Sequence, residues 1–365
     1  MEYISLASGA TYFNTPESAG TAAIRAIQNH KTYYGLTEGT LALRKAIAGR
    51  YLKLNEAKVS PENILITPGT KQALYNILRN LVNPGDEVIV PKPNWFGLNQ
   101  VLQTVQAQLV FWTTAARQDY ALLPADLEKL ITPKTRLVLI SNPCNPTGRI
   151  YQEPELVALL TVLEKYPDIY LLSDEIYGLV TYDKKVPTLA QFNDPHQRHI
   201  IVNGFSKAFA MSGWRIGYLV MPPHLVKTCQ EFQQITFSGV SEFVQEAALA
   251  VMLDVENILT PMRQVLTQHR QIMLSFLDDL KLTCFKPEAA YYVFPDFSTY
   301  LSSRIPTISA LAQHLKENYA LEILPGDLFG APGYARLSFA IPKEKLIFAL
   351  KRLSLALKQL KSFQA

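Results

Sequence analysis

The sequence predicts an α/β fold, in which a large domain with a mostly parallel sheet covered by helices precedes a smaller α/β C-terminal domain. Three observations support this prediction. The chain has 365 residues, enough for roughly two domains of about 150 residues each. It is 48% hydrophobic and 18% charged, a composition that suits a folded protein and argues against disorder. Short apolar runs alternate with amphipathic helical patterns, as in a sheet that helices cover on both faces.

The first two thirds of the chain supply the elements of the expected large domain. An apolar run predicts a strand at Ile64–Thr67, and a helix opens near Gly69 and runs to Leu81. A turn at residues 83–86 then leads to a strand at Glu87–Val90. The elements expected next are the strand Leu137–Ser141, the helix Glu153–Lys165, and the strands Ile169–Ser173, His199–Asn203 and Tyr218–Met221.

The last third of the chain begins with a long helical pattern, from about Ser241 to Leu280. Strands return after Leu282, and a final helix closes the chain. These elements are the strands Tyr291–Pro295, Leu321–Leu324 and Ala335–Phe339 and the helix Lys343–Leu360. We therefore expect a large domain over residues 31–260 and a small domain over 261–365. Residues 1–30 are expected to be an N-terminal segment of the small domain with a shortened arm.

Charge and cysteine content exclude several classes of protein. A net charge of +4 is dilute over this length, and no Lys/Arg run suited to a phosphate backbone occurs, so no nucleic-acid partner is expected. No apolar stretch reaches the roughly 18 to 20 residues that span a bilayer, so no membrane association is expected. The three cysteines are far apart, and the first residues do not resemble a signal peptide. We therefore expect a cytoplasmic protein.

Polar residues directly follow three of the expected strands: Asn145, Asp174 and Lys207. Ligands of open α/β sheets bind beyond the carboxyl ends of the strands, so we expect a cofactor site there. No GxGxxG follows a strand and no GxxxxGK[ST] occurs, which removes the best support for a dinucleotide or a triphosphate. The six histidines show no HExxH or HxH spacing, so no metal site is expected.

Eight segments of the chain form a specific set because they occur together and in a fixed order. They are Leu6–Gly9, Tyr34–Gly39, Thr67–Leu74, Pro93–Trp95, Ser141–Gly148, Ser173–Tyr177, Gly204–Gly217 and Arg336–Ala340. In this order they resemble the class I/II aminotransferases, the fold-type I enzymes that use pyridoxal 5′-phosphate (PLP). Within this family, the chain resembles the aspartate/prephenate-type bacterial branch. The resemblance runs from about Leu6 to the end and implies that the large domain binds PLP.

The resemblance implies roles for residues around the cofactor ring. Lys207 would form the Schiff base with the PLP aldehyde, and it needs a lowered pKa to be nucleophilic. Asp174 would keep the pyridine nitrogen protonated, so that the ring accepts electrons from Cα. Asn145 and Tyr177 look like the pair that hydrogen-bonds the phenolate oxygen, and Trp95 matches the aromatic residue that stacks on the ring. Lys207, Asp174 and Tyr177 are thus the expected catalytic residues.

A second group of residues matches the phosphate site of the family. Gly69, Thr70 and Lys71 open an expected helix, where free backbone N–H groups and the helix dipole favour an anion. Arg215 lies eight residues after Lys207, the family's spacing for a phosphate-binding arginine. Tyr34 matches a tyrosine that reaches the phosphate of the neighbouring subunit, which implies a homodimer with shared sites.

The resemblance also implies a substrate site and a reaction. Arg336 matches the arginine that binds the substrate α-carboxylate, and the backbone of Gly9 would lie against that carboxylate. Trp95 and Asn145 also belong to the expected substrate site. Lys207 would move a proton from Cα to the cofactor, in a ping-pong transamination between an L-amino acid and a 2-oxo acid. Glutamate and 2-oxoglutarate are the expected pair, and a PLP-dependent C–S (cysteine-conjugate beta) lyase is the alternative.

Four positions leave questions about the site. Gly204 stands where many family members carry a serine that contacts phosphate, and Ser206 is a candidate to compensate. Residues 289–292 read Ala-Ala-Tyr-Tyr instead of the frequent Gly-Ala-Phe-Tyr, and only eight residues precede Gly9. Lys71 occupies a position where aspartate- and prephenate-type members carry a lysine that can meet an acidic side chain. A solvated lysine at a helix start is the other interpretation of this residue.

Overall fold

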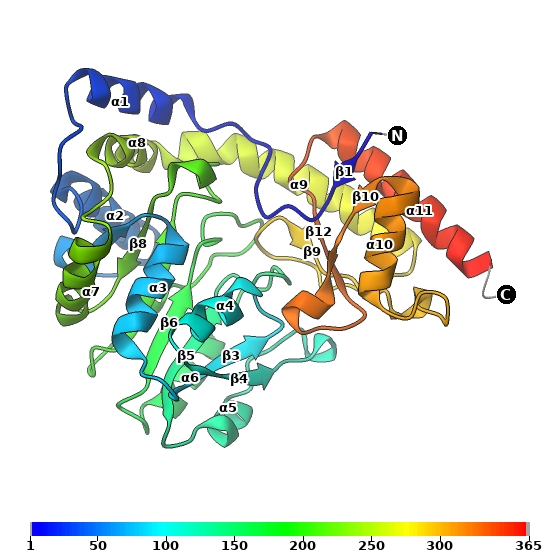
Figure 1. The fold of residues 1–365 in the computed structure, drawn as a ribbon, viewed down its shortest axis with the longest axis horizontal. Coiled ribbons are helices and arrows are strands. Elements are labelled where there is room, and N and C mark those ends of the chain that lie inside the picture. The colour runs from blue at the N-terminus through cyan, green and yellow to red at the C-terminus, as the bar shows by residue number, and fades with distance from the viewer. Residues whose placement is uncertain (1, 363–365) are drawn as a thin grey trace.

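A seven-stranded sheet forms the centre of the larger part of the molecule (Figure 1). The structure is a computed structural model and describes residues 2–362. Across the sheet the strands are β2 (Ile64–Thr67), β8 (Gly217–Val220), β7 (His199–Gly204), β6 (Tyr170–Asp174), β5 (Thr135–Ser141), β3 (Glu87–Lys92) and β4 (Gln108–Thr113). Strand β8 runs antiparallel to both of its neighbours, and all the other pairs are parallel.

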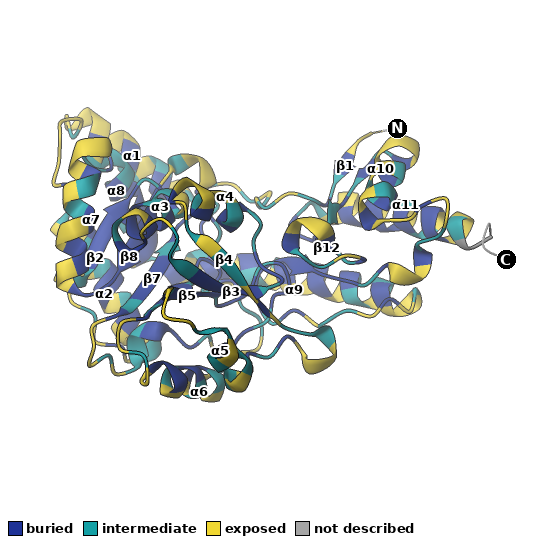
Figure 2. Cartoon of the chain, turned by 60° about the horizontal axis from the view of Figure 1, so that its bottom comes forward, coloured by how far each residue is buried: buried dark blue, intermediate teal, exposed yellow. Residues whose placement is uncertain are grey.

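Helices cover this sheet on both faces. They are α2 (Leu41–Asn55), α3 (Thr70–Leu81), α4 (Gly97–Thr104), α5 (Pro124–Leu130), α6 (Glu153–Leu163), α7 (Pro223–Thr236) and α8 (Glu242–Leu253), while α1 (Glu17–Gln28) packs against α8. Successive residues of a strand point to opposite faces, so Ile64 and Ile66 join one hydrophobic cluster and Leu65 joins the other. Figure 2 shows the strands buried between helices whose outer faces are exposed.

The smaller part of the molecule combines the end of the chain with its first strand. An antiparallel sheet has the order β11 (Leu324–Pro325), β12 (Ala335–Ser338) and β9 (Tyr292–Val293). Strand β1 (Ile4–Ser5) pairs in parallel with β10 (Leu321–Glu322). The helices here are α10 (Ile308–Tyr319) and α11 (Lys343–Ser362), while α9 (Val255–Asp279) runs from beside α8 to the small part (Figure 1).

The expected α/β class and the mostly parallel sheet are confirmed, and several element boundaries are corrected. The helical stretch expected from Ser241 to Leu280 is two helices, because Asp254 leaves helical geometry between them (φ −125°, ψ 31°). The single strand expected at Leu321–Leu324 is divided, since β10 pairs with β1 and β11 pairs with β12. The division into domains at residues 30 and 260 stays a prediction.

Candidate active site

One cavity of about 370 Å³ lies at the carboxyl ends of β5, β6 and β7, where a cofactor site is expected, and β12 contributes to its wall. Of the twelve expected site residues, ten line it. These are Gly9, Thr70, Lys71, Trp95, Asn145, Asp174, Tyr177, Lys207, Arg215 and Arg336. Gly69 adjoins the cavity through its contact with Arg215. Tyr34 does not line the cavity, and its side chain is 93% exposed.

Lys207 follows β7 and reaches across the cavity to the N-terminal segment. Its Nζ donates a hydrogen bond to the carbonyl oxygen of Gly9 at 2.6 Å. Burial, and next the cation of Arg336, lower the pKa of Lys207 to about 8, while the charge of Asp174 opposes the shift. A larger fraction of this amine is therefore neutral, and able to act as a nucleophile or base, than for a lysine in water.

Asp174 ends β6 and is exposed in part to the cavity. The backbone N–H of Ile176 donates to its Oδ1 at 3.2 Å. Loss of water raises the pKa of Asp174 to about 6, although this N–H and the charge of Lys207 favour the ionised form. A carboxylate in this setting is stabilised by any cationic or N–H donor that enters the cavity.

Gly69 and Arg215 form one end of the cavity. Gly69 has φ +89°, and a Cβ on it would lie 2.3 Å from Nη2 of Arg215, so only glycine fits beside the guanidinium. Arg215 itself has φ 55° and donates to the carbonyl oxygen of Ser212 at 2.7 Å. Thr70 begins α3, whose first N–H groups have no side-chain cap. A helix N-terminus beside an arginine is a site that favours an anion.

The packing around Gly204 explains why this position is not a serine. A Cβ on Gly204 would lie 3.0 Å from the Cγ2 methyl of Thr70 and 3.0 Å from the Cα of Gly217. The side chain of Thr70 therefore occupies the space that a serine at 204 would need. Ser206 is buried and lines the cavity, so it stays a candidate donor.

Arg336 comes from β12 in the small part and is 3% exposed. Its Nη1 donates to Oδ1 of Asn145 at 3.0 Å and its Nη2 to the carbonyl oxygen of Ala7 at 2.8 Å, while its buried Nε has no partner among residues 2–362. The guanidinium carbon lies 4.1 Å from the ring centroid of Tyr292. The guanidinium of Arg336 is thus held in place on two sides, and its fork of N–H donors suits a carboxylate.

Further residues line the cavity beyond the twelve expected site residues. Tyr292 places its hydroxyl 2.8 Å from the hydroxyl of Tyr177. Ser212 stands inside one of the recognised sequence segments, so that segment could have indicated it. Phe96 and Leu324 lie in no such segment, and only the packing of distant parts of the chain brings them to the cavity.

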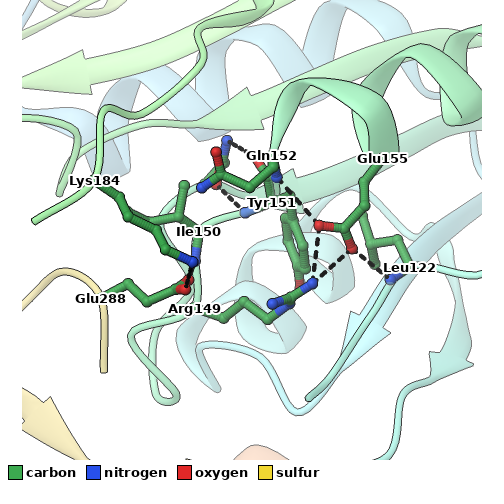
Figure 3. A network of polar contacts seen from close by, with 9 residues as sticks. Leu122, Arg149, Ile150, Tyr151, Gln152, Glu155, Lys184 and Glu288 are labelled. Atoms are coloured by element: carbon green, nitrogen blue, oxygen red, sulfur yellow. Dashed lines mark hydrogen bonds and ion pairs between the residues drawn. The ribbon is translucent and has the colours of Figure 1, made fainter. Parts of the chain in front are cut away.

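A polar network holds residues 149–155, the segment that follows the Asn145 loop in the chain (Figure 3). Arg149 donates to both carboxylate oxygens of Glu155 at 2.9 Å. The backbone N–H of Ile150 donates to Glu288 at 2.9 Å, and Lys184 pairs with the same carboxylate. Glu288 belongs to the segment that leads into β9, so the network joins residues 149–155 to the small part.

The sequence matches the family described as aminotransferase class I and II over residues 1–353. The chain belongs to this family. It is 35% identical over 363 residues to an aspartate/prephenate aminotransferase of Nitrosomonas europaea, covering 96% of this chain and 91% of that protein. An aspartate aminotransferase of Pinus pinaster is 33% identical over 368 residues, with 97% and 74% covered.

Solved structures agree with this assignment. Aspartate aminotransferase from Thermus thermophilus with maleate superposes with a TM-score of 0.92 at 31% identity, covering 97% of this chain and 91% of that one. The aromatic aminotransferase from Pyrococcus horikoshii OT3 gives a TM-score of 0.93 at 30% identity, with 98% and 96% covered.

These matches show that the chain is a transaminase and that its family is PLP-dependent. They do not favour the C–S lyase alternative.

Among residues 2–362, no three His, Cys, Asp or Glu side chains gather in a way that could hold a metal ion. Over the same residues, no helix combines the length and apolar character needed to cross a membrane.

Proposed function

We propose that this aminotransferase binds PLP in the cavity and exchanges an amino group between an acidic L-amino acid and a 2-oxo acid. Glutamate and 2-oxoglutarate form one of the pairs. The observation that carries the proposal is that a single cavity brings together three features. They are the amine of Lys207, the carboxylate of Asp174, and the anion site formed by Arg215 and the start of α3.

These features fit PLP at three points. The carboxylate of Asp174 suits the protonated pyridine nitrogen, and Lys207 suits the aldehyde. The space beside Gly69 that Arg215 faces suits the phosphate, with Thr70, Lys71 and the candidate Ser206 nearby.

When bound, PLP supplies a ring that accepts the electrons left on the substrate once Cα has lost a proton. Arg336 and the backbone of Gly9 would hold the substrate carboxylate. Lys207 Nζ would then take the proton from Cα, and return one to Cα of the second substrate in the reverse half-reaction. Asn145, Tyr177 and Trp95 would orient the ring by hydrogen bonding and stacking.

The acidic substrate class is proposed from Lys71 and from the names of the relatives. Lys71 is exposed, lines the cavity, and holds its Nζ 5.5 Å from the ring centroid of Trp95. An ammonium group here can meet a second carboxylate. With PLP saturating, Lys71→Ala should raise KM for dicarboxylates about tenfold, the effect of one lost ion pair of about 1.4 kcal/mol, and leave KM for neutral substrates unchanged. Steady-state kinetics on both classes measure this, and equal losses would contradict it.

We also propose a homodimer in which Tyr34 reaches the phosphate of the neighbouring subunit. Large apolar side chains are exposed on this chain at Tyr33 (82%), Tyr34 (93%), Ile235 (81%) and Phe237 (51%). Exposed apolar surface of this kind is typical of association sites.

The three cysteines are free, which agrees with the reducing cytoplasm that we propose as the location.

Absorption spectroscopy tests the cofactor and the reaction together. The purified protein supplied with PLP should show the visible band of lysine-bound cofactor. L-glutamate should remove the band, and 2-oxoglutarate should restore it. A band that responds only to cysteine conjugates, with release of ammonia, would instead support elimination. Absence of the band in the PLP-loaded protein would contradict the proposal.

A further inference from the structure

The carbonyl oxygen of Gly9 faces three hydrogen-bond donors from distant parts of the chain. Lys207 Nζ lies 2.6 Å away, the hydroxyl of Tyr291 3.0 Å and the hydroxyl of Tyr292 3.2 Å. The two tyrosines are 1% and 0% exposed, so bulk water does not replace their partners. A carbonyl oxygen has two lone pairs, so three donors are more than it can satisfy fully.

The three donors differ in whether they can keep their hydrogen bond to the carbonyl oxygen of Gly9 during the reaction. Lys207 must leave Gly9 in order to act on a cofactor or a substrate. Tyr292 has one hydroxyl proton, and its oxygen is also 2.8 Å from the hydroxyl of Tyr177. If Tyr177 donates its own proton into the cavity, Tyr292 is left to donate to Tyr177. Tyr291 does not line the cavity, so nothing bound there competes directly for its hydroxyl.

We infer that Tyr291 is a positioning residue whose hydroxyl holds the carbonyl of Gly9 when Lys207 leaves it. This inference rests on the proposed role of Lys207. It also gives a purpose to the tyrosine at 291, where phenylalanine would fill the same space without a donor.

The position of Gly9 explains why this hydrogen bond matters for the reaction. A Cβ on Gly9 would lie 3.8 Å from Lys207 Nζ and 3.9 Å from Nη2 of Arg336. Arg336 is in turn bonded to Ala7 in the same segment. A shift of the segment therefore changes the space beside the arginine that would receive the substrate carboxylate. Tyr291 would act on substrate binding through Gly9 and without touching the substrate.

Hydrogen exchange of the full chain tests the inference without any need for activity. Exchange of peptides covering residues 6–14 is compared in four proteins: wild type, Tyr291→Phe, Lys207→Ala and the double variant. With Lys207 present, Tyr291→Phe should change exchange less than twofold. In the Lys207→Ala background it should speed exchange about fivefold, the effect of one lost hydrogen bond. Equal effects in both backgrounds, or no effect in either, would overturn the inference.

Kinetics give a second readout that a general loss of stability would not reproduce. Tyr291→Phe should raise KM for amino acid and 2-oxo acid about fivefold and leave kcat within about twofold, because binding and not proton transfer is changed. Tyr319→Phe is the matched control, since its hydroxyl bonds Gln359 away from the cavity. A fall in kcat with unchanged KM would overturn the inference. Coupled exchange in a protein without transaminase activity would contradict the proposed function alone.

Discussion

Glu175 follows Asp174 directly but does not line the cavity, and it is 4% exposed. Thr188 donates to one of its oxygens at 2.8 Å and the N–H of Leu189 to the other at 2.9 Å. Burial still raises the pKa of Glu175 from 4.5 to about 7, against the effect of these hydrogen bonds. The carboxyl group is therefore partly protonated in the folded protein near neutral pH.

This shift predicts how stability depends on pH. The folded protein binds the proton more tightly than the unfolded chain, so the contribution of Glu175 to stability falls as pH rises from 4.5 through about 7. Glu175→Gln keeps the shape and stays neutral. Relative to wild type it should be more stable by about 2 kcal/mol at pH 8 than at pH 5. Thermal or urea unfolding at the two pH values measures this. Exposed Glu231→Gln is the control, and an equal difference at both pH values would contradict the prediction.

At the scale of residues, the sequence predicts the site residues that lie in recognisable segments at strand ends. Asp174 and Lys207 each follow a strand, and the structure brings both to one cavity. Tyr34 is different, because its expected partner is a second subunit and a single chain cannot provide it. Leu324 and Phe96 are ordinary apolar residues in their own segments, and only tertiary packing makes them part of the cavity.

At the scale of elements, the start of α3 depends on the glycine before it. Gly69→Ala would force a side chain at φ +89° and place its Cβ 2.3 Å from Arg215. The guanidinium must then move away from the start of the helix. PLP affinity should fall about tenfold or more, corresponding to about 1.4 kcal/mol. Titration of the apoprotein with PLP measures this.

Gly20→Ala is the matched control for this prediction. Gly20 lies within α1, and a Cβ there would meet no atom of the described residues within 4 Å. This change should leave PLP affinity unchanged and raise stability by about 0.5–1 kcal/mol, because alanine favours helix. An affinity for PLP that Gly69→Ala does not alter would show that Arg215 and Gly69 do not form the phosphate site.

Element boundaries follow from the sequence where local signals are strong. Ile64–Thr67 is a wholly buried apolar run beside a proline and a glycine, and the structure has a strand over the same residues. Leu321–Leu324 is also apolar, but two different partners divide it, and pairing across the fold is not encoded locally. Strand β4 contains four consecutive apolar residues, Leu109 to Trp112, but it lies at the sheet edge and is mostly exposed or half-buried, and it is not among the strands predicted from the sequence.

At the scale of the whole molecule, Glu288 joins the large and small parts (Figure 3). It accepts the N–H of Ile150, while its own N–H and that of Ala289 donate to the carbonyl of Gly148. Glu288→Ala would leave the N–H of Ile150 without its partner, which should cost about 1–3 kcal/mol of stability. The loop that carries Asn145 would also shift relative to Arg336, so kcat/KM should fall.

Lys184→Met separates the two contacts that Glu288 makes. Lys184 is 51% exposed, and surface ion pairs contribute about 0–1 kcal/mol, so this variant should stay close to wild type. Chemical unfolding of both variants measures the difference. Equal losses would mean that the ion pair, and not the buried backbone contact, holds the junction.

Mixing two inactive variants tests whether active sites are shared between subunits. Tyr34→Ala should lose its contribution to the neighbouring site, and Lys207→Ala should lose its own catalytic amine. In a mixed dimer, one site regains Lys207 from the first variant and Tyr34 from the second. Because half of the dimers in an equal random mixture are mixed and each restores one site, activity should reach about a quarter of wild type. Sedimentation of each variant confirms that both still form dimers. If Tyr34 served its own subunit, the mixture would be no more active than the average of its parts, and the exposed apolar surface around Tyr34 would need another explanation.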